Sequence, residues 1–170
     1  MSGWDDVELT ALGRQQAEGA AGQLAGTPFT RCLVSDLRRA RETAAIVLAG
    51  RVIPVHVLPE LRERHMGSLQ GEMGTAVRSD GRSERWLLNW HVGAPGGESH
   101  ADSVARALAI LRHWDDGAST LVVAHGALIR DLLGVIDGES VTAIPAASAT
   151  LNCVPIRRDI RTWPELNAHA

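Results

Sequence analysis

The stretch that most constrains the fold is TLVVAHGALIRDLL, residues 120–133. Residues 121–124 form an unbroken apolar run, which is typical of a strand buried on both faces, and His125-Gly126 interrupts it abruptly. Apolar residues then recur at helical spacing over 127–133, so a helix is expected directly after His125-Gly126. The sequence therefore predicts a parallel strand of an α/β sheet that leads straight into a helix.

The start of this helix carries no Ser, Thr, Asp or Asn that would cap it. Its first backbone N–H groups are therefore expected to lack a side-chain acceptor. An uncapped helix at the carboxyl end of a parallel strand is a natural anion site. His125 would lie at the mouth of that site; the alternative is a buried structural histidine satisfied by a backbone carbonyl.

Composition limits the class of protein. The chain has 170 residues, 45% of them hydrophobic and 22% charged, which fits a single domain over 1–170. A formal net charge of −3 argues against nucleic acid or an anionic membrane as partner, and no apolar run reaches membrane-spanning length. Cys32 and Cys153 lie in apolar segments without metal-like spacing. We expect a cytoplasmic protein with both thiols reduced and buried.

The first half of the chain alternates between helical and extended patterns. Thr10 is expected to cap a helix that ends near Gly26, and residues 32–35 are predicted to form a short strand. Asp36 is expected to cap a helix over 37–49. Residues 52–58 are rich in β-formers, and Pro54 within them indicates a strand at the edge of a sheet.

The second half continues this alternation. Residues 75–90 are ambiguous, with a helix expected around 85–89. Ser99 and Asp102 predict a capping box for a helix that runs to 114, and a last strand is expected over 150–156. Strands that alternate with helices predict an α/β three-layer sandwich with a mainly parallel central sheet.

The segment SDLRRARETA, residues 35–44, is the second chemical signal. Three arginines stand at or near the first turn of a helix, where the macrodipole is already positive, and an anionic ligand would resolve this conflict. Arg39 is the one we expect to face a ligand. Arg38 and Arg41 are expected to be solvated and paired with Glu42 or Asp36.

The third signal is the segment 59–72, which has too many charges and glycines for a core element and is predicted to be a functional loop. Glu63 in this loop is a candidate general acid in a phosphate-bearing pocket. The alternative is a surface salt bridge. Among the other imidazoles, His65 is a conceivable replacement nucleophile, whereas His91 and His100 are expected to face solvent.

Taken together, these segments resemble the histidine phosphatase superfamily, which includes the cofactor-dependent phosphoglycerate mutases. The match covers nearly the whole chain in the right order: Gly3-Trp4 with Leu9-Thr10 and Gly13, residues 35–44, Glu63-Arg64-His65 with Gly67 and residues 69–71, residues 95–99, and Ala124-His125-Gly126. The resemblance implies a phosphoglycerate mutase-like sandwich. It also implies that Arg39 and His125 bind the transferring phosphate, that Glu63 donates a proton, and that Gly3, Ser35 and Gly126 contact substrate.

One departure from the family pattern bears on the mechanism. Family members begin with a central strand that ends in Arg-His-Gly, whose histidine is the nucleophile, and no Arg-His-Gly occurs in this sequence. The resemblance therefore implies that the first central strand is missing from this chain. Its loss would leave strand edges open, so a homodimer through that edge is a possible way to close the sheet.

Three functions remain open at this point. The first is a divergent enzyme that acts on a small anionic or phosphorylated metabolite by acid–base chemistry, without the usual phosphohistidine. The second is a phosphomonoesterase whose nucleophile-bearing first strand lies outside this sequence. The third is a non-catalytic binding or assembly protein. The short segment 71–97 favours the compact phosphatase branch over a true mutase. No cofactor and no metal are expected, because the histidines and carboxylates do not fall at dependable ligand spacings.

Overall fold

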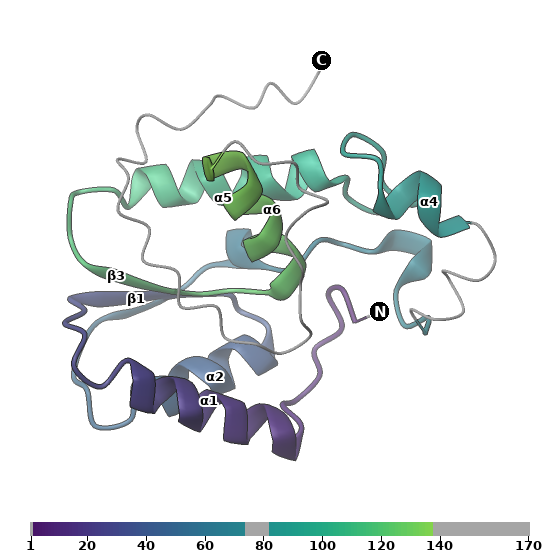
Figure 1. The fold of residues 1–170 in the computed structure, drawn as a ribbon. Helices are drawn as coiled ribbons and strands as arrows, with labels where there is room; N and C mark the ends of the chain where they lie inside the picture. The colour runs from purple at the N-terminus through teal and green to yellow at the C-terminus, as the bar shows by residue number, and fades with distance from the viewer. Residues whose placement is uncertain (1, 74–81, 138–170) are drawn as a thin grey trace.

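The computed structural model describes residues 2–73 and 82–137 (Figure 1). Its strands are β1 (Arg31–Val34), β2 (Val55–Val57) and β3 (Thr120–Val123). Its α-helices are α1 (Ala11–Gln23), α2 (Arg38–Val47), α4 (Arg82–Leu87), α5 (His100–His113) and α6 (Gly126–Asp137). Two short 3-10 turns, η1 (Pro59–Leu61) and η2 (Gly67–Leu69), interrupt the loop that carries Glu63.

The three described strands form one parallel sheet in the order β2-β1-β3. Val34 of β1 is aligned with Val57 of β2 and with Val123 of β3. The predicted parallel pairing is therefore confirmed, and so is the edge position of β2 within the described sheet. The strand expected over 150–156 lies outside the described residues.

Helices cover both faces of the sheet, α1 and α2 on one side and α5 and α6 on the other (Figure 1). The alternation of side chains along β1 explains this arrangement. Cys32 and Val34 are buried with Ala44 of α2, whereas Leu33 between them is buried with Leu128 of α6. The predicted three-layer α/β sandwich is thus confirmed.

The second edge of β3 differs from the rest of the sheet. Among the described residues, β3 pairs with β1 alone. Val122 lies opposite Leu33 in the register, yet 37% of Val122 is exposed, whereas Leu121 and Val123 on either side are buried. An apolar side chain is therefore uncovered at this edge of the described sheet.

Local capping explains where two of the helices begin. Thr10 Oγ1 accepts a hydrogen bond from the Gly13 N–H at 3.1 Å, as predicted for α1. Ser99 and Asp102 form both halves of the predicted capping box at α5. None of the described helices is long and apolar enough to cross a membrane.

The prediction that Asp36 caps α2 is wrong. The Asp36 carboxylate accepts hydrogen bonds from Arg62 Nε at 2.8 Å and Nη2 at 2.5 Å instead. The Arg38 N–H at the start of α2 donates to Asp6 Oδ1 at 2.6 Å. A carboxylate from the N-terminal loop therefore takes the place expected for Asp36, because a bidentate guanidinium holds Asp36 elsewhere.

Candidate active site

The candidate site lies at the carboxyl ends of β1 and β3, where each strand passes into a helix (Figure 1). Ser35 follows β1 directly and His125 follows β3 by two residues. The Ser35 N–H continues the ladder by donating to the Val123 carbonyl at 3.0 Å. Because the two strands are parallel neighbours, both junctions open at the same edge of the sheet.

His125 is buried, with 6% of the residue exposed. Its Nε2 lies 2.8 Å from the Ser35 hydroxyl, so the ring is buried but is held by a side chain and not by the backbone carbonyl of the second alternative. Burial lowers the pKa of His125 to about 3, and the nearby charges of Arg39 and Arg106 act in the same direction, against Asp36. The imidazole is therefore neutral near pH 7.

Arg39 comes to the same place from the first turns of α2. Its Nη1 donates to the Asp5 carbonyl at 2.8 Å and its Nη2 donates to the Gly3 carbonyl at 2.8 Å. Burial lowers the pKa of Arg39, while the carboxylates of Glu63, Asp6 and Asp5 oppose that shift. The structure thus brings Arg39 close to both Glu63 and His125. Arg38, in contrast, is exposed and pairs with Glu42, as expected.

Gly3 contributes its backbone to this arrangement. It has φ +41°, and a Cβ at this position would lie 2.9 Å from Met66 Cγ and 3.0 Å from Gln70 Oε1. Only glycine fits here without strain or displacement of its neighbours. The carbonyl of Gly3 accepts a hydrogen bond from Arg39 Nη2, so the backbone at Gly3 helps to fix the position of the guanidinium.

Glu63 occupies the N-terminus of α6. Its carboxylate accepts hydrogen bonds from the N–H groups of Ala127 and Leu128, each at 3.1 Å, and from its neighbour Arg64 at 3.0 Å. The prediction that this helix is uncapped is therefore wrong, because the acceptor comes from a loop more than sixty residues earlier. The expected surface salt bridge of Glu63 is not among the ion pairs of the described residues. The anion site exists, and a carboxylate fills it.

Gly126 begins α6 beside this carboxylate. Over residues 2–73 and 82–137, a Cβ built on Gly126 would meet no heavy atom within 4 Å, apart from its chain neighbours and the backbone of its own helix. The backbone between His125 and the Glu63 carboxylate is therefore open to the approach of a small molecule.

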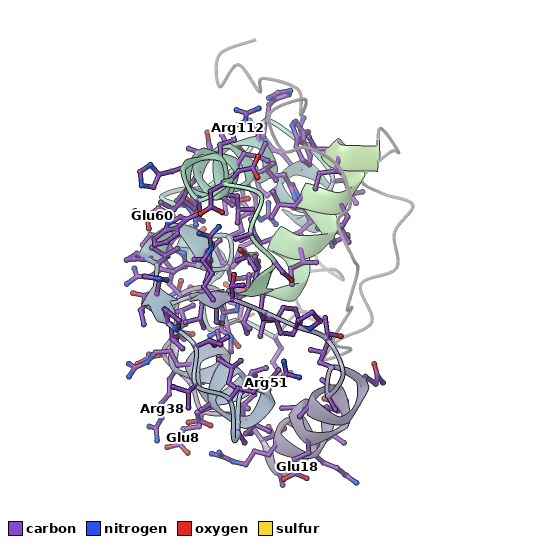
Figure 2. All side chains as sticks on the ribbon, turned by 90° about the vertical axis from the view of Figure 1, so that its left-hand side faces the viewer. Glu8, Glu18, Arg38, Arg51, Glu60 and Arg112 are labelled. Atoms are coloured by element: carbon purple, nitrogen blue, oxygen red, sulfur yellow. The ribbon has the colours of Figure 1, made fainter. Side chains whose placement is uncertain are left out.

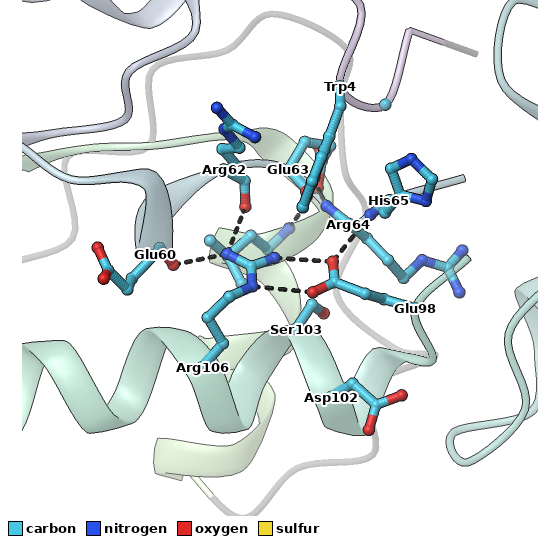
Figure 3. Close-up of polar contacts among 12 residues, drawn as sticks. Trp4, Glu60, Arg62, Glu63, Arg64, His65, Glu98, Asp102, Ser103 and Arg106 are labelled. Atoms are coloured by element: carbon cyan, nitrogen blue, oxygen red, sulfur yellow. Dashed lines mark hydrogen bonds and ion pairs between the residues drawn. The ribbon is translucent and has the colours of Figure 1, made fainter. Parts of the chain in front are cut away.

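An arginine clamp that the sequence reasoning missed holds the Glu63 loop in place (Figure 3). Arg106 of α5 donates to both oxygens of Glu98, at 2.9 and 2.8 Å, and its Nη1 donates to the carbonyls of Glu60 and Arg62. Glu98 Oε2 also accepts the His65 N–H at 2.9 Å. Glu98 precedes the N-cap Ser99 and lies outside α5, so no helical spacing in the sequence connects it to Arg106.

Trp4 and Arg62 form the outer wall of the site and were also missed. The Arg62 guanidinium lies 4.6 Å from the Trp4 ring centroid, and Trp4 Nε1 donates to the Glu63 carbonyl at 2.7 Å (Figure 3). The contact with Asp36 lowers the pKa of that carboxyl and raises the pKa of Arg62. The aromatic ring and the ion pair connect the N-terminal loop to the Glu63 loop.

Comparison with known proteins agrees with this geometry. The family model described as "Histidine phosphatase superfamily (branch 1)" matches residues 1–167. The chain belongs to the histidine phosphatase superfamily.

Individual relatives of this chain include mutases and phosphatases. It is 36% identical to a 2,3-bisphosphoglycerate-dependent phosphoglycerate mutase of Methylobacterium sp. (strain 4-46), over 85% of this chain and 76% of the relative. It is 32% identical to the adenosylcobalamin/alpha-ribazole phosphatase of Salmonella typhimurium, over 86% of this chain and 73% of that protein.

Solved structures give the same result. A mycobacterial glucosyl-3-phosphoglycerate phosphatase has a TM-score of 0.72 and 32% identity, over 83% of this chain and 73% of that one. The Bacillus stearothermophilus protein YhfR has a TM-score of 0.78 and 30% identity, over 88% of this chain and 79% of that one. The phosphoglycerate mutase-like fold expected from the sequence is thereby confirmed.

The structure also describes the three other imidazoles considered from the sequence, His65, His91 and His100. His65 Nδ1 lies 2.9 Å from the Gly96 carbonyl, and its ring packs edge-on against Trp4. His91 is exposed, as predicted. The prediction that His100 faces solvent is wrong: it is buried between Asp131 and the Leu87 carbonyl. Over 2–73 and 82–137, no cluster of His, Cys, Asp and Glu could hold a metal ion.

Proposed function

We propose that this histidine phosphatase acts on a small phosphorylated or otherwise anionic metabolite by acid–base chemistry at the carboxyl ends of β1 and β3. One observation carries the proposal. A buried neutral imidazole, His125, and a half-buried guanidinium, Arg39, come from two different strand-to-helix junctions. They lie close enough that the positive charge of Arg39 helps to lower the pKa of His125. A planar guanidinium and a ring N–H are donors suited to phosphate oxygens.

The three groups have separate roles in this proposal. Arg39 and His125 bind the anion, and their charge and N–H dipole stabilise negative charge that develops on it. Glu63 exchanges the proton with the leaving group. Its contacts with the N–H groups of Ala127 and Leu128 support the placement of a negative group here, since a carboxylate oxygen already lies at the start of α6.

Two versions of the function differ in the nucleophile. In the first, the described residues act on a metabolite without a phosphohistidine. In the second, the protein is a phosphomonoesterase, and a strand that carries the nucleophile pairs with the second edge of β3. Such a strand would cover Val122, which is 37% exposed in the described sheet. The intact mass of the native protein, together with the coding frame upstream of Met1, distinguishes them.

The decisive experiment is turnover of an aryl phosphate and of a set of phosphorylated metabolites. We expect His125→Ala and Arg39→Ala each to lower kcat/KM on the order of 100-fold, as the loss of one preorganised donor does elsewhere. Glu63→Ala should lower kcat more for poor leaving groups than for an aryl phosphate, since only the former need the proton.

Arg41→Ala is the matched control, because Arg41 lies on the same helix but is exposed. It should leave turnover unchanged. Equal turnover in wild type and in the His125 and Arg39 variants would refute the assignment of the site. Tight binding of phosphate without any turnover would indicate a binding protein and contradict the proposed enzymatic function.

Two further proposals concern the surroundings of the protein. We propose a homodimer through the second edge of β3, as an alternative way to cover Val122. We also propose a cytoplasmic location. The buried thiol of Cys32, which is free and whose pKa burial raises to about 11, supports a reduced environment.

A further inference from the structure

Ser35 and His125 form the most completely buried polar contact of the site. Ser35 is 0% exposed and His125 is 6% exposed. The Ser35 hydroxyl oxygen lies 2.8 Å from His125 Nε2. The family resemblance implied that Ser35 contacts substrate. A fully enclosed hydroxyl, however, can act on a ligand only through the residue that it contacts.

The direction of this hydrogen bond follows from counting protons. The Ser35 oxygen accepts the Leu37 N–H at 3.3 Å, which uses one lone pair. A hydroxyl has one proton to donate. Among the described residues, His125 Nε2 is the only hydrogen-bond acceptor for that proton. If Nε2 carried a proton instead, the buried Ser35 O–H would have no acceptor among the described residues, which is unfavourable for a buried donor.

We propose that Ser35 is a positioning residue: by donating to Nε2 it holds His125 in the tautomer that is protonated at Nδ1, so that Nδ1–H is the donor offered to a bound anion. This inference rests on the proposed function, because it names how the same site recognises its anion. In the part of the chain that the structure describes, Nδ1 has no hydrogen-bond partner.

The opposite tautomer would be the wrong one for an anion. With the proton on Nε2, Nδ1 would present a lone pair to the bound anion and repel a phosphate oxygen. The low pKa of His125 leaves the ring with a single proton at neutral pH, so its position decides whether the ring attracts or repels. Ser35 thus converts a neutral imidazole into a directed N–H donor.

The wild-type protein itself tests the proposal. A long-range ¹H–¹⁵N correlation spectrum reports which ring nitrogen is protonated, and His125→Gln identifies the His125 signals by their loss. We expect Nδ1 to be protonated near neutral pH. A proton on Nε2 in the wild type would overturn the proposal without the need for any Ser35 variant.

Ser35→Ala provides the second arm. We expect His125 to move to the Nε2-protonated form, and the Kd for inorganic phosphate to rise about tenfold, the effect of losing one hydrogen bond to a charged group. Ser103→Ala is the control, since Ser103 is also 0% exposed but donates to the His100 carbonyl. It should change neither the tautomer nor phosphate binding. An unchanged Nδ1-protonated ring in Ser35→Ala would refute the role of Ser35.

The two proposals fail in different ways. If wild type has the expected tautomer but inorganic phosphate does not bind, the proposed function is wrong and the hydrogen bond stands. If phosphate binds and His125→Gln abolishes binding, but the wild-type ring is protonated at Nε2, the proposed function stands and the inference about Ser35 is wrong.

Discussion

Burial governs the chemistry of His125, and the same burial makes the stability of the protein depend on pH. The pKa of His125 is lowered from 6.5 to about 3 in the folded chain. Between these values the unfolded chain binds more protons than the folded one. The contribution of the neutral ring to the free energy of unfolding is therefore fully present above about pH 6.5, and it is lost as the pH falls toward 3.

His125→Asn tests this dependence at a single residue. On acidification below about pH 6.5, wild type should lose up to about 1.4 kcal/mol of unfolding free energy per pH unit more than the variant, because the variant has no imidazole to protonate. Urea denaturation of both proteins at about pH 7, 6 and 5 measures the difference. Parallel pH profiles would contradict a depressed pKa.

Residues that act within their own segment could be predicted from the sequence, and residues that act across segments could not. His125 and Arg39 stand next to their strand-to-helix junctions, so local pattern located them at one edge of the sheet. The cap by Asp36 and the uncapped start of α6 were predicted wrongly, because the partners that decide them, Arg62 and Glu63, come from segments distant in the sequence. A side chain's partner across the fold leaves no trace in local spacing.

At the scale of elements, the Glu63 carboxylate secures the start of α6. Glu63→Ala should lower the free energy of unfolding by about 1 kcal/mol, the usual cost of losing a helix cap. The amides of Ala127 and Leu128 should exchange with deuterium faster, since their acceptor is gone. Glu60→Ala is the control, because Arg106 binds the carbonyl of Glu60 and not its side chain (Figure 3). Unchanged exchange at both amides in Glu63→Ala would disprove the cap.

A second element, α4, ends against two buried side chains. Arg64 Nη1 donates to the Trp86 carbonyl and His100 Nε2 lies against the Leu87 carbonyl, each at 2.9 Å. Such partners satisfy carbonyls that the last turn of a helix leaves without an intrahelical hydrogen bond. Asp131, fully buried, lies 2.5 Å from His100 Nδ1, and its charge acts on Arg64 as well. Asp131 therefore interacts with both side chains that contact the end of α4.

Asp131→Asn should consequently destabilise the protein by about 3–5 kcal/mol, since removing one partner leaves buried charge uncompensated. Chemical denaturation measures this loss. The Asp116→Asn variant is the comparison. Asp131 accepts two hydrogen bonds from Arg130, and Asp116 accepts two from Arg31, but on the surface, so replacement of Asp116 should cost far less. Similar losses for the two variants would show that burial does not decide the strength of these pairs.

At the scale of the whole molecule, alternation of strands and helices was sufficient to predict a parallel sheet between two helical layers. Apolar runs over 32–35 and 121–124 mark buried strands, and helical periodicity marks the segments that cover them. The side view in Figure 2 places the labelled charged residues, such as Glu18, Arg38 and Arg112, at the outer surfaces of those layers. The order of the strands could not be predicted, because pairing between distant segments depends on the whole set of packed faces.

The second edge of β3 is the interface of the proposed homodimer. Val122 is 37% exposed there, while Val57 is 49% exposed on β2, at the opposite edge of the described sheet. If two copies pair through β3, Val122→Lys should shift the protein from dimer to monomer, because a charge at the edge opposes strand pairing. Val57→Lys should leave the mass unchanged. Light scattering across a range of concentrations measures both, and dissociation by the Val57 variant alone would place the interface at the wrong edge for this proposal.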